Sequence, residues 1–134
     1  MKFVKMNLLD IQPSQFYLSE EKLRAIMEWF DPEDLSCFEP LPLKYLNGRV
    51  IFTDGHTRAY AAYRAGCASV PMVWDEDELS WELYQICVDA CLERGIRNVA
   101  DLEGRILSKE AYAEKWNRWC DELQQEASKN EQSS

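Results

Sequence analysis

The sequence predicts an α/β (α+β) fold, in which a small mixed sheet carries helices and is followed by a helical C-terminal appendage. Three observations support this prediction. Short apolar runs flank the hairpin pair Asn47-Gly48, apolar residues recur at helical spacing in four other segments, and Gly66 and Gly95 stand where helices are expected to end. The expected order of elements is β-α-β-β-α-β-α-α.

The chain has 134 residues, which is the length of one domain with its own core. We expect residues 1–76 to form the α/β core and residues 77–124 to form helices packed on the same domain. Residues 125–134 are polar and are predicted to be disordered.

The first elements are read from apolar residues and turn formers. Residues 8–11 predict a short strand that Pro13-Ser14 closes. Ser19 is the expected N-cap of a helix that Asp31-Pro32 ends. The apolar stripe of that helix consists of Leu23, Ile26, Met27 and Phe30.

The middle of the chain predicts a hairpin, a helix and a further strand. Residues 41–46 and 49–53 flank the hairpin turn, and the apolar run 50–52 is typical of a central strand covered on both faces. A helix over 57–65 follows. Residues 70–74 predict another strand, with Pro71 either placing it at an edge or forming its opening.

The C-terminal part begins with the acidic run 75–78, which we interpret as a solvated loop. Ser80 can cap a helix that continues to about Arg94. Ser108 opens a final helix with a largely aromatic stripe, which is either core or the surface that binds a partner protein or forms a homodimer. The stripe consists of Tyr112, Trp116, Trp119 and Leu123.

Charge and cysteine content exclude several classes of protein. The net charge of -9 argues against autonomous DNA binding, which needs a basic face. Five irregularly spaced cysteines, with no secretory segment at residues 1–3, indicate reduced thiols and a cytoplasmic location. No apolar run approaches the roughly 20 residues needed to span a bilayer, so no membrane association is expected. Cys87 and Cys91 lie one helical turn apart but fall short of a zinc site.

The segment Asp54-Gly55-His56-Thr57-Arg58, where a predicted strand meets a predicted helix, carries the candidate site. The N-terminus of a helix presents free N–H groups to an anion, and glycine lets the backbone approach a ligand. Thr57 and Arg58 add donors suited to phosphate. His56, the single histidine, is expected to face the ligand. The alternative is a simple cap, with Asp54 or Thr57 capping the helix and Arg58 on the surface.

The stretch from Ile11 to Trp74 resembles the ParB/sulfiredoxin-like (ParB N-terminal-like nuclease) superfamily. The resemblance rests on Pro13-Ser14, the helix at 20–29, the segment 39–43, the turn 54–58, the Ala-rich helix ending at Gly66, and Val70-Pro71.

Within that superfamily, ParB-type proteins bind CTP, sulfiredoxins use ATP, and one branch is an ADP-dependent serine kinase. The resemblance therefore implies a nucleotide or phosphorylated small molecule at Gly55, His56, Thr57 and Arg58, with Mg²⁺ as a further candidate. A phosphotransferase or nucleotide hydrolase would use Asp54, His56 or Glu39 in catalysis. Asp54 or Glu39 would bind the metal.

Two departures from the family pattern narrow these expectations. Sulfiredoxins carry a catalytic cysteine where this chain has His56, which argues against a sulfiredoxin-type reductase. ParB proteins usually show Glu-Arg-Arg where this chain has His56-Thr57-Arg58. The remaining alternative from another class is a non-catalytic interaction or accessory module.

Overall fold

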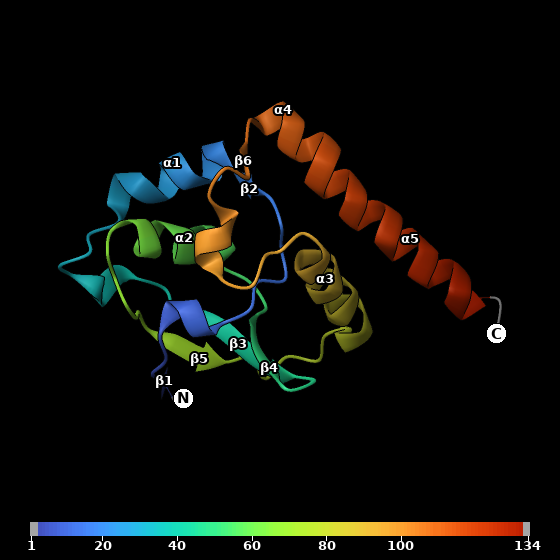
Figure 1. Ribbon diagram of the computed structural model, residues 1–134, viewed down its shortest axis with the longest axis horizontal. Coiled ribbons are helices and arrows are strands. Elements are labelled where there is room, and N and C mark those ends of the chain that lie inside the picture. Colours follow the sequence, from blue (N-terminus) through green and yellow to red (C-terminus); the bar gives the residue numbers. More distant parts are fainter. Residues whose placement is uncertain (1–2, 133–134) are drawn as a thin grey trace.

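The computed structural model describes the backbone of residues 3–132 and the side chains of residues 3–127. Met1 and Lys2, and the last two residues of the expected tail, Ser133 and Ser134, lie outside the described residues. A mixed four-stranded sheet, with α1 and α2 to one side and α3 near one end, forms the body of the protein (Figure 1). The mixed α/β class and the C-terminal helices are therefore confirmed.

The sheet has the strand order β1-β5-β3-β4. β1 pairs antiparallel with β5, β5 pairs parallel with β3, and β3 pairs antiparallel with β4. The strands are β1 (Phe3–Val4), β3 (Leu41–Leu46), β4 (Arg49–Phe52) and β5 (Met72–Trp74).

The predicted hairpin is confirmed, because β3 and β4 are joined by Asn47 and Gly48 with φ values of 49° and 84°. The expected central position of residues 50–52 is wrong, because β4 is the last strand in the sheet order. Gln12 nevertheless covers this edge: its N–H donates to the Val50 carbonyl at 2.9 Å, and its carbonyl accepts from the Phe52 N–H at 3.0 Å. β5 lies between β1 and β3, so Pro71 precedes a central strand rather than an edge strand.

The first predicted strand, residues 8–11, is also wrong. Asn7 accepts a hydrogen bond from the Leu9 N–H and caps the 3₁₀ turn η1 (Leu8–Asp10) instead. This local side-chain bond gives the backbone an alternative to sheet pairing. The strand at the start of the sheet is β1, five residues earlier than expected.

α1 begins at its predicted N-cap, and α2 ends before its predicted C-terminal glycine. α1 (Glu20–Trp29) begins after Ser19, whose hydroxyl accepts from the Lys22 N–H, although Met27 of its predicted stripe is 54% exposed. α2 (His56–Arg64) is closed by Gly66 with φ 88°. A second 3₁₀ turn, η2 (Leu35–Cys37), lies between α1 and β3.

The C-terminal part completes the domain. α3 (Trp81–Glu93) is followed by η3 (Val99–Leu102) and by β6 (Ile106–Leu107), which pairs parallel with β2 (Leu18–Ser19). The chain then forms α4 (Lys109–Tyr112), one π-turn (Ala113–Asn117) and α5 (Arg118–Gln132). Residues 125–132 therefore continue a helix, where the sequence predicted a disordered tail, and α5 extends beyond the body (Figure 1).

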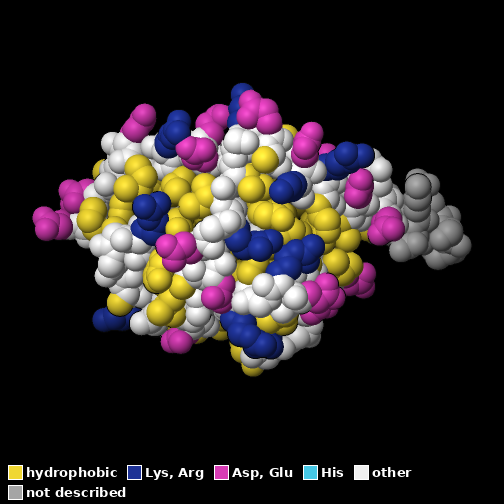
Figure 2. Space-filling view, turned by 45° about the horizontal axis from the view of Figure 1, so that its top comes forward, with side chains coloured by type: hydrophobic (Ala, Val, Ile, Leu, Met, Phe, Trp, Pro, Cys, Tyr) yellow, Lys and Arg dark blue, Asp and Glu magenta, His cyan; other side chains and the backbone are white. Residues whose placement is uncertain are grey.

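One hydrophobic core includes residues from both halves of the chain. Phe16 is 1% exposed and makes edge-on contacts with Trp116 and Trp119, each at 4.9 Å between ring centroids. Tyr112 and Trp116 are buried, so the first half of the aromatic stripe belongs to the core. On the face that carries α1 and α4, apolar side chains are interspersed with charges of both signs (Figure 2).

Candidate functional site

The turn after β4 leaves the beginning of α2 without a side-chain cap. Gly55 is the N-cap residue, with φ 75° and ψ 22°, and no side chain accepts from the first turn of the helix. The first backbone bond there joins the Ala59 N–H to the Gly55 carbonyl at 2.9 Å. The N–H groups of His56, Thr57 and Arg58 come before that bond and therefore have no acceptor within the helix. Such N–H groups are the condition for an anion site. The simple-cap alternative is therefore wrong for Asp54 and Thr57.

Glycine is favoured at position 55. Its φ lies in the left-handed region, where side chains other than hydrogen are strained. A Cβ placed there would lie 2.7 Å from Arg58 Nη2 and 2.8 Å from Leu41 Cδ2. The guanidinium of Arg58 therefore lies directly against the Gly55 backbone.

Arg58 is held by the segment before β3. Its Nη1 donates to the Glu39 carbonyl at 2.9 Å and to Glu39 Oε2 at 3.2 Å. The Arg58 side chain is 15% exposed and the Glu39 side chain is 83% exposed. Arg58 therefore lies inside the site rather than on the surface, and Glu39, not Asp54, is its partner.

Asp54 forms a hydrogen bond within the turn. Its Oδ1 accepts from the Gly55 N–H at 2.8 Å, which fixes the turn. Both Asp54 and Glu39 line the cavity at this turn.

The cavity at the turn has a volume of about 370 Å³ and lies between the start of α2, the Glu39 segment and α1. All six residues that the sequence analysis singled out line it. Sequence reasoning missed Gln15 and Lys22, which line it as well. Lys22 is on the exposed part of α1, and no spacing in the sequence relates it to a turn 32 residues later.

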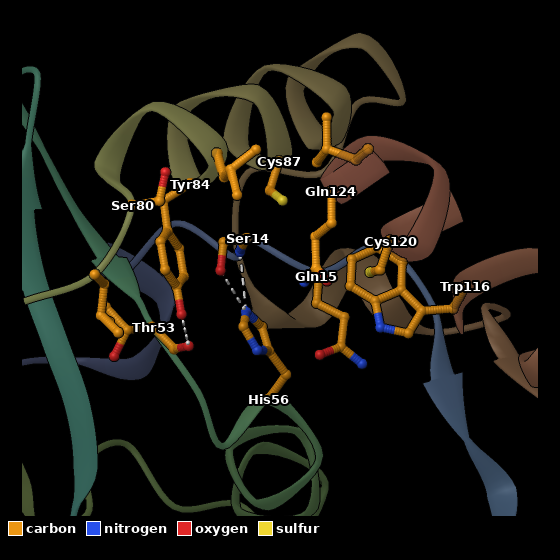
Figure 3. A pocket seen from close by; sticks show the side chains of 13 residues that line it. Ser14, Gln15, Thr53, His56, Ser80, Tyr84, Cys87, Trp116, Cys120 and Gln124 are labelled. Carbon is orange, nitrogen blue, oxygen red and sulfur yellow. Dashed lines mark hydrogen bonds between the residues drawn. The ribbon is translucent and has the colours of Figure 1, made fainter. Parts of the chain in front are cut away.

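His56 lines the cavity, but its Nε2 is already bonded within the protein. It is 4% exposed, and its Nε2 accepts the backbone N–H of Ser14 at 2.9 Å (Figure 3). The Ser14 hydroxyl in turn donates to the Phe52 carbonyl at 2.7 Å. Burial lowers the pKa of His56 to about 4, while the nearby Asp54 carboxylate acts in the opposite direction. The imidazole is therefore neutral at pH 7 and positions the loop at Ser14.

Other potential sites are weaker. Within residues 3–127, no group of three or more His, Cys, Asp or Glu side chains is arranged to hold a metal ion. Burial raises the pKa of Cys87 and of Cys91 to about 12, so both thiols stay protonated. None of the described helices is long and apolar enough to cross a bilayer.

Comparisons with known proteins add little. No protein-family model matches the chain, and no curated protein matches its sequence. A solved structure, protein Atu1540 from Agrobacterium tumefaciens, is similar with a TM-score of 0.47 and 14% sequence identity. The similarity covers 75% of this chain and 61% of that protein's chain, so this chain matches about three fifths of its length.

Proposed function

We propose that this protein binds the phosphate of a nucleotide or of another phosphorylated small molecule at the turn from Asp54 to Arg58. The observation that carries the proposal is an uncapped helix N-terminus that faces a cavity lined by Arg58 and Lys22. In a chain of net charge -9, Arg58 at the uncapped start of α2 forms a local site for an anion. Lys22 adds a second cation to the cavity wall, with its ammonium over the Tyr112 ring, 5.3 Å from the ring centroid.

The donors of this site are preorganised. The bond to the Glu39 carbonyl fixes the Arg58 guanidinium before any ligand arrives, so less side-chain entropy is lost on binding. Hydrogen bonds between a guanidinium and a phosphate are charge-assisted and stronger than neutral ones. The exposed Glu39 carboxylate, 3.2 Å from Nη1, is the group that a phosphate oxygen would displace.

The two carboxylates of the cavity bear on the choice of ligand. Asp54 and Glu39 would repel a phosphate, and a Mg²⁺ ion bound between carboxylate and phosphate oxygens would remove that repulsion. Mg²⁺ with ATP, ADP or CTP therefore belongs to the proposal. The volume of about 370 Å³ is near the lower end of ligand pockets, which suits a small phosphorylated molecule or part of a nucleotide.

A kinase resembling the ADP-dependent serine kinase is a narrower version of the same proposal. Phosphoryl transfer uses a carboxylate that orients or deprotonates the nucleophile. Asp54 and Glu39 both line the cavity and can supply it. His56 is a poor candidate for that role because its Nε2 is already bonded to the Ser14 N–H.

The experiment is a thermal-shift and calorimetry series with phosphate, ATP, ADP, CTP and GTP, each with and without Mg²⁺. A ligand at 100 times its Kd raises the apparent free energy of unfolding by about 2.7 kcal/mol. Lys22→Ala is compared with Arg24→Ala on the same helix, and Arg58→Ala with Arg64→Ala. Arg24 and Arg64 are exposed and lie outside this cavity.

We expect Lys22→Ala and Arg58→Ala to weaken binding about tenfold or more, and the two control variants to bind as the wild type does. No response to any of these ligands would contradict the proposal. Equal responses in the site variants and their controls would also contradict it.

A further inference from the structure

We infer that a second cavity in this protein binds a neutral, largely apolar small molecule that carries an O–H or N–H donor. This cavity has a volume of about 300 Å³ and lies between α3, the C-terminal helices and the loop at Ser14 (Figure 3). The inference does not depend on the proposed phosphate site.

The walls of the cavity lack charge. None of the described residues that line it is Asp, Glu, Lys or Arg, although these make up 29% of the chain. The titratable groups present are uncharged at pH 7 as well. Burial lowers the pKa of His56 to about 4, and burial raises the pKa of Cys87 to about 12 and that of Cys120 to about 11. An ionic ligand would lose its hydration here without gaining a partner of opposite charge.

The apolar part of the wall comes from two sides. Leu79 lies just before α3, and Leu83 lies in its first turn. Trp116 belongs to the π-turn, and Leu123 belongs to α5. Trp116 is fixed by its contact with Phe16 at 4.9 Å. A rigid aromatic ring and leucine side chains form the kind of surface that buries a flat or aliphatic group.

Two hydroxyl groups in the wall can only accept a hydrogen bond from a ligand. The hydroxyl of Tyr84 donates to the Thr53 carbonyl at 2.9 Å, and that of Ser14 donates to the Phe52 carbonyl at 2.7 Å. Each hydroxyl has therefore used its hydrogen inside the protein, and only its oxygen lone pairs remain for a ligand. A ligand that carries an O–H or N–H group satisfies them.

The second cavity adjoins the first. Gln15 and His56 line both, so the neutral ligand would lie beside the turn at Gly55. The first cavity is lined by charged residues and the second is not, so we expect an anion in the first and a neutral molecule in the second.

The test is a titration of ¹⁵N-labelled protein at pH 7, with indole and benzyl alcohol as donor probes and toluene as a probe without a donor. The variant Leu83→Trp fills the cavity, and Ile86→Trp on the same helix is its control, because Ile86 is 43% exposed and does not line the cavity. Leu123→Trp, from the opposite wall, replaces Leu83→Trp if that variant does not fold. A separate titration with inorganic phosphate reports on the turn at Gly55.

We expect saturable shifts with both donor probes at amides of α3 and α5, and weaker binding of toluene. Affinity should fall about tenfold or more when the cavity is filled and stay unchanged in Ile86→Trp. The inference is overturned if neither donor probe gives a saturable shift, if the filled variant binds equally, or if toluene binds as tightly as benzyl alcohol. A missing response to phosphate would concern only the proposed phosphate site.

Discussion

The single histidine should make the stability of this protein depend on pH between about 7 and 5. His56 is buried, and its Nε2 accepts the Ser14 N–H, so the protonated imidazole would lose this bond and its hydration together. Its pKa is about 4 in the folded protein and about 6.5 in the unfolded chain. The unfolded state therefore binds the proton first, and stability is complete above pH 6.5 and falls as the pH drops toward 4.

The size of the effect follows from these two values. A difference of about 2.5 pH units, at about 1.4 kcal/mol per unit, gives a loss of about 3 kcal/mol by pH 4. About 2 kcal/mol of this loss falls between pH 6.5 and 5, where few carboxylates titrate. Urea unfolding followed by tryptophan fluorescence at several pH values measures it, and His56→Gln is the control because its amide oxygen can still accept the Ser14 N–H.

The same residue can be observed directly. Because the chain has one histidine, a single imidazole resonance reports its pKa by NMR. A histidine that titrates near 6.5 would refute the reasoning. So would a free energy of unfolding that stays constant from pH 7 to 5, or one that falls equally in His56→Gln.

Three further predictions concern packing and reactivity. Gly55→Ala should cost about 2 kcal/mol more than Gly48→Ala, because both have positive φ but only the Cβ at 55 meets other atoms, and urea unfolding of both variants measures the difference. N-ethylmaleimide at pH 8 should modify the exposed Cys37 well before Cys87, as mass spectrometry can follow, and equal rates would contradict the burial of that thiol. Phe16→Ala should lower the free energy of unfolding by about 3–5 kcal/mol, and a loss below 1 kcal/mol would show that its two tryptophan contacts are dispensable.

The parts of the fold that the sequence predicts correctly depend on nearby residues. The Asn47-Gly48 turn and the Ser19 cap are set by residues within a few positions of one another, and both occur as expected. The pairing of β2 with β6 joins residues 88 positions apart, and two-residue strands show no periodicity that would reveal them. The polar end of α5 was predicted as disordered, yet it follows an established helix, and extending a helix is easier than starting one.

In the candidate site, too, the local features could be predicted from the sequence and the long-range contacts could not. The glycine turn and the arginine could be predicted because they are local to one strand-helix junction. Lys22 reaches the cavity from α1, and the contact between His56 and Ser14 spans 42 residues. A lone histidine next to a glycine gives no sign in the sequence of whether its imidazole faces a ligand or the protein interior.

The contacts of residues 12–19 have a consequence for how the chain folds during synthesis. Gln12 Nε2 donates to the Ile96 carbonyl at 2.8 Å, and Arg105 Nε donates to the Phe16 carbonyl at 2.6 Å. These partners lie 84 and 89 residues later in the sequence, and the tryptophans that cover Phe16 lie later still, so they all leave the ribosome long after residues 12–19. Until then the Phe16 ring is exposed to solvent. Chains in such a state are bound by chaperones and begin to aggregate. Ribosome-bound chains that end before residue 96 should be protease-sensitive around Phe16, whereas the finished protein should resist cleavage there.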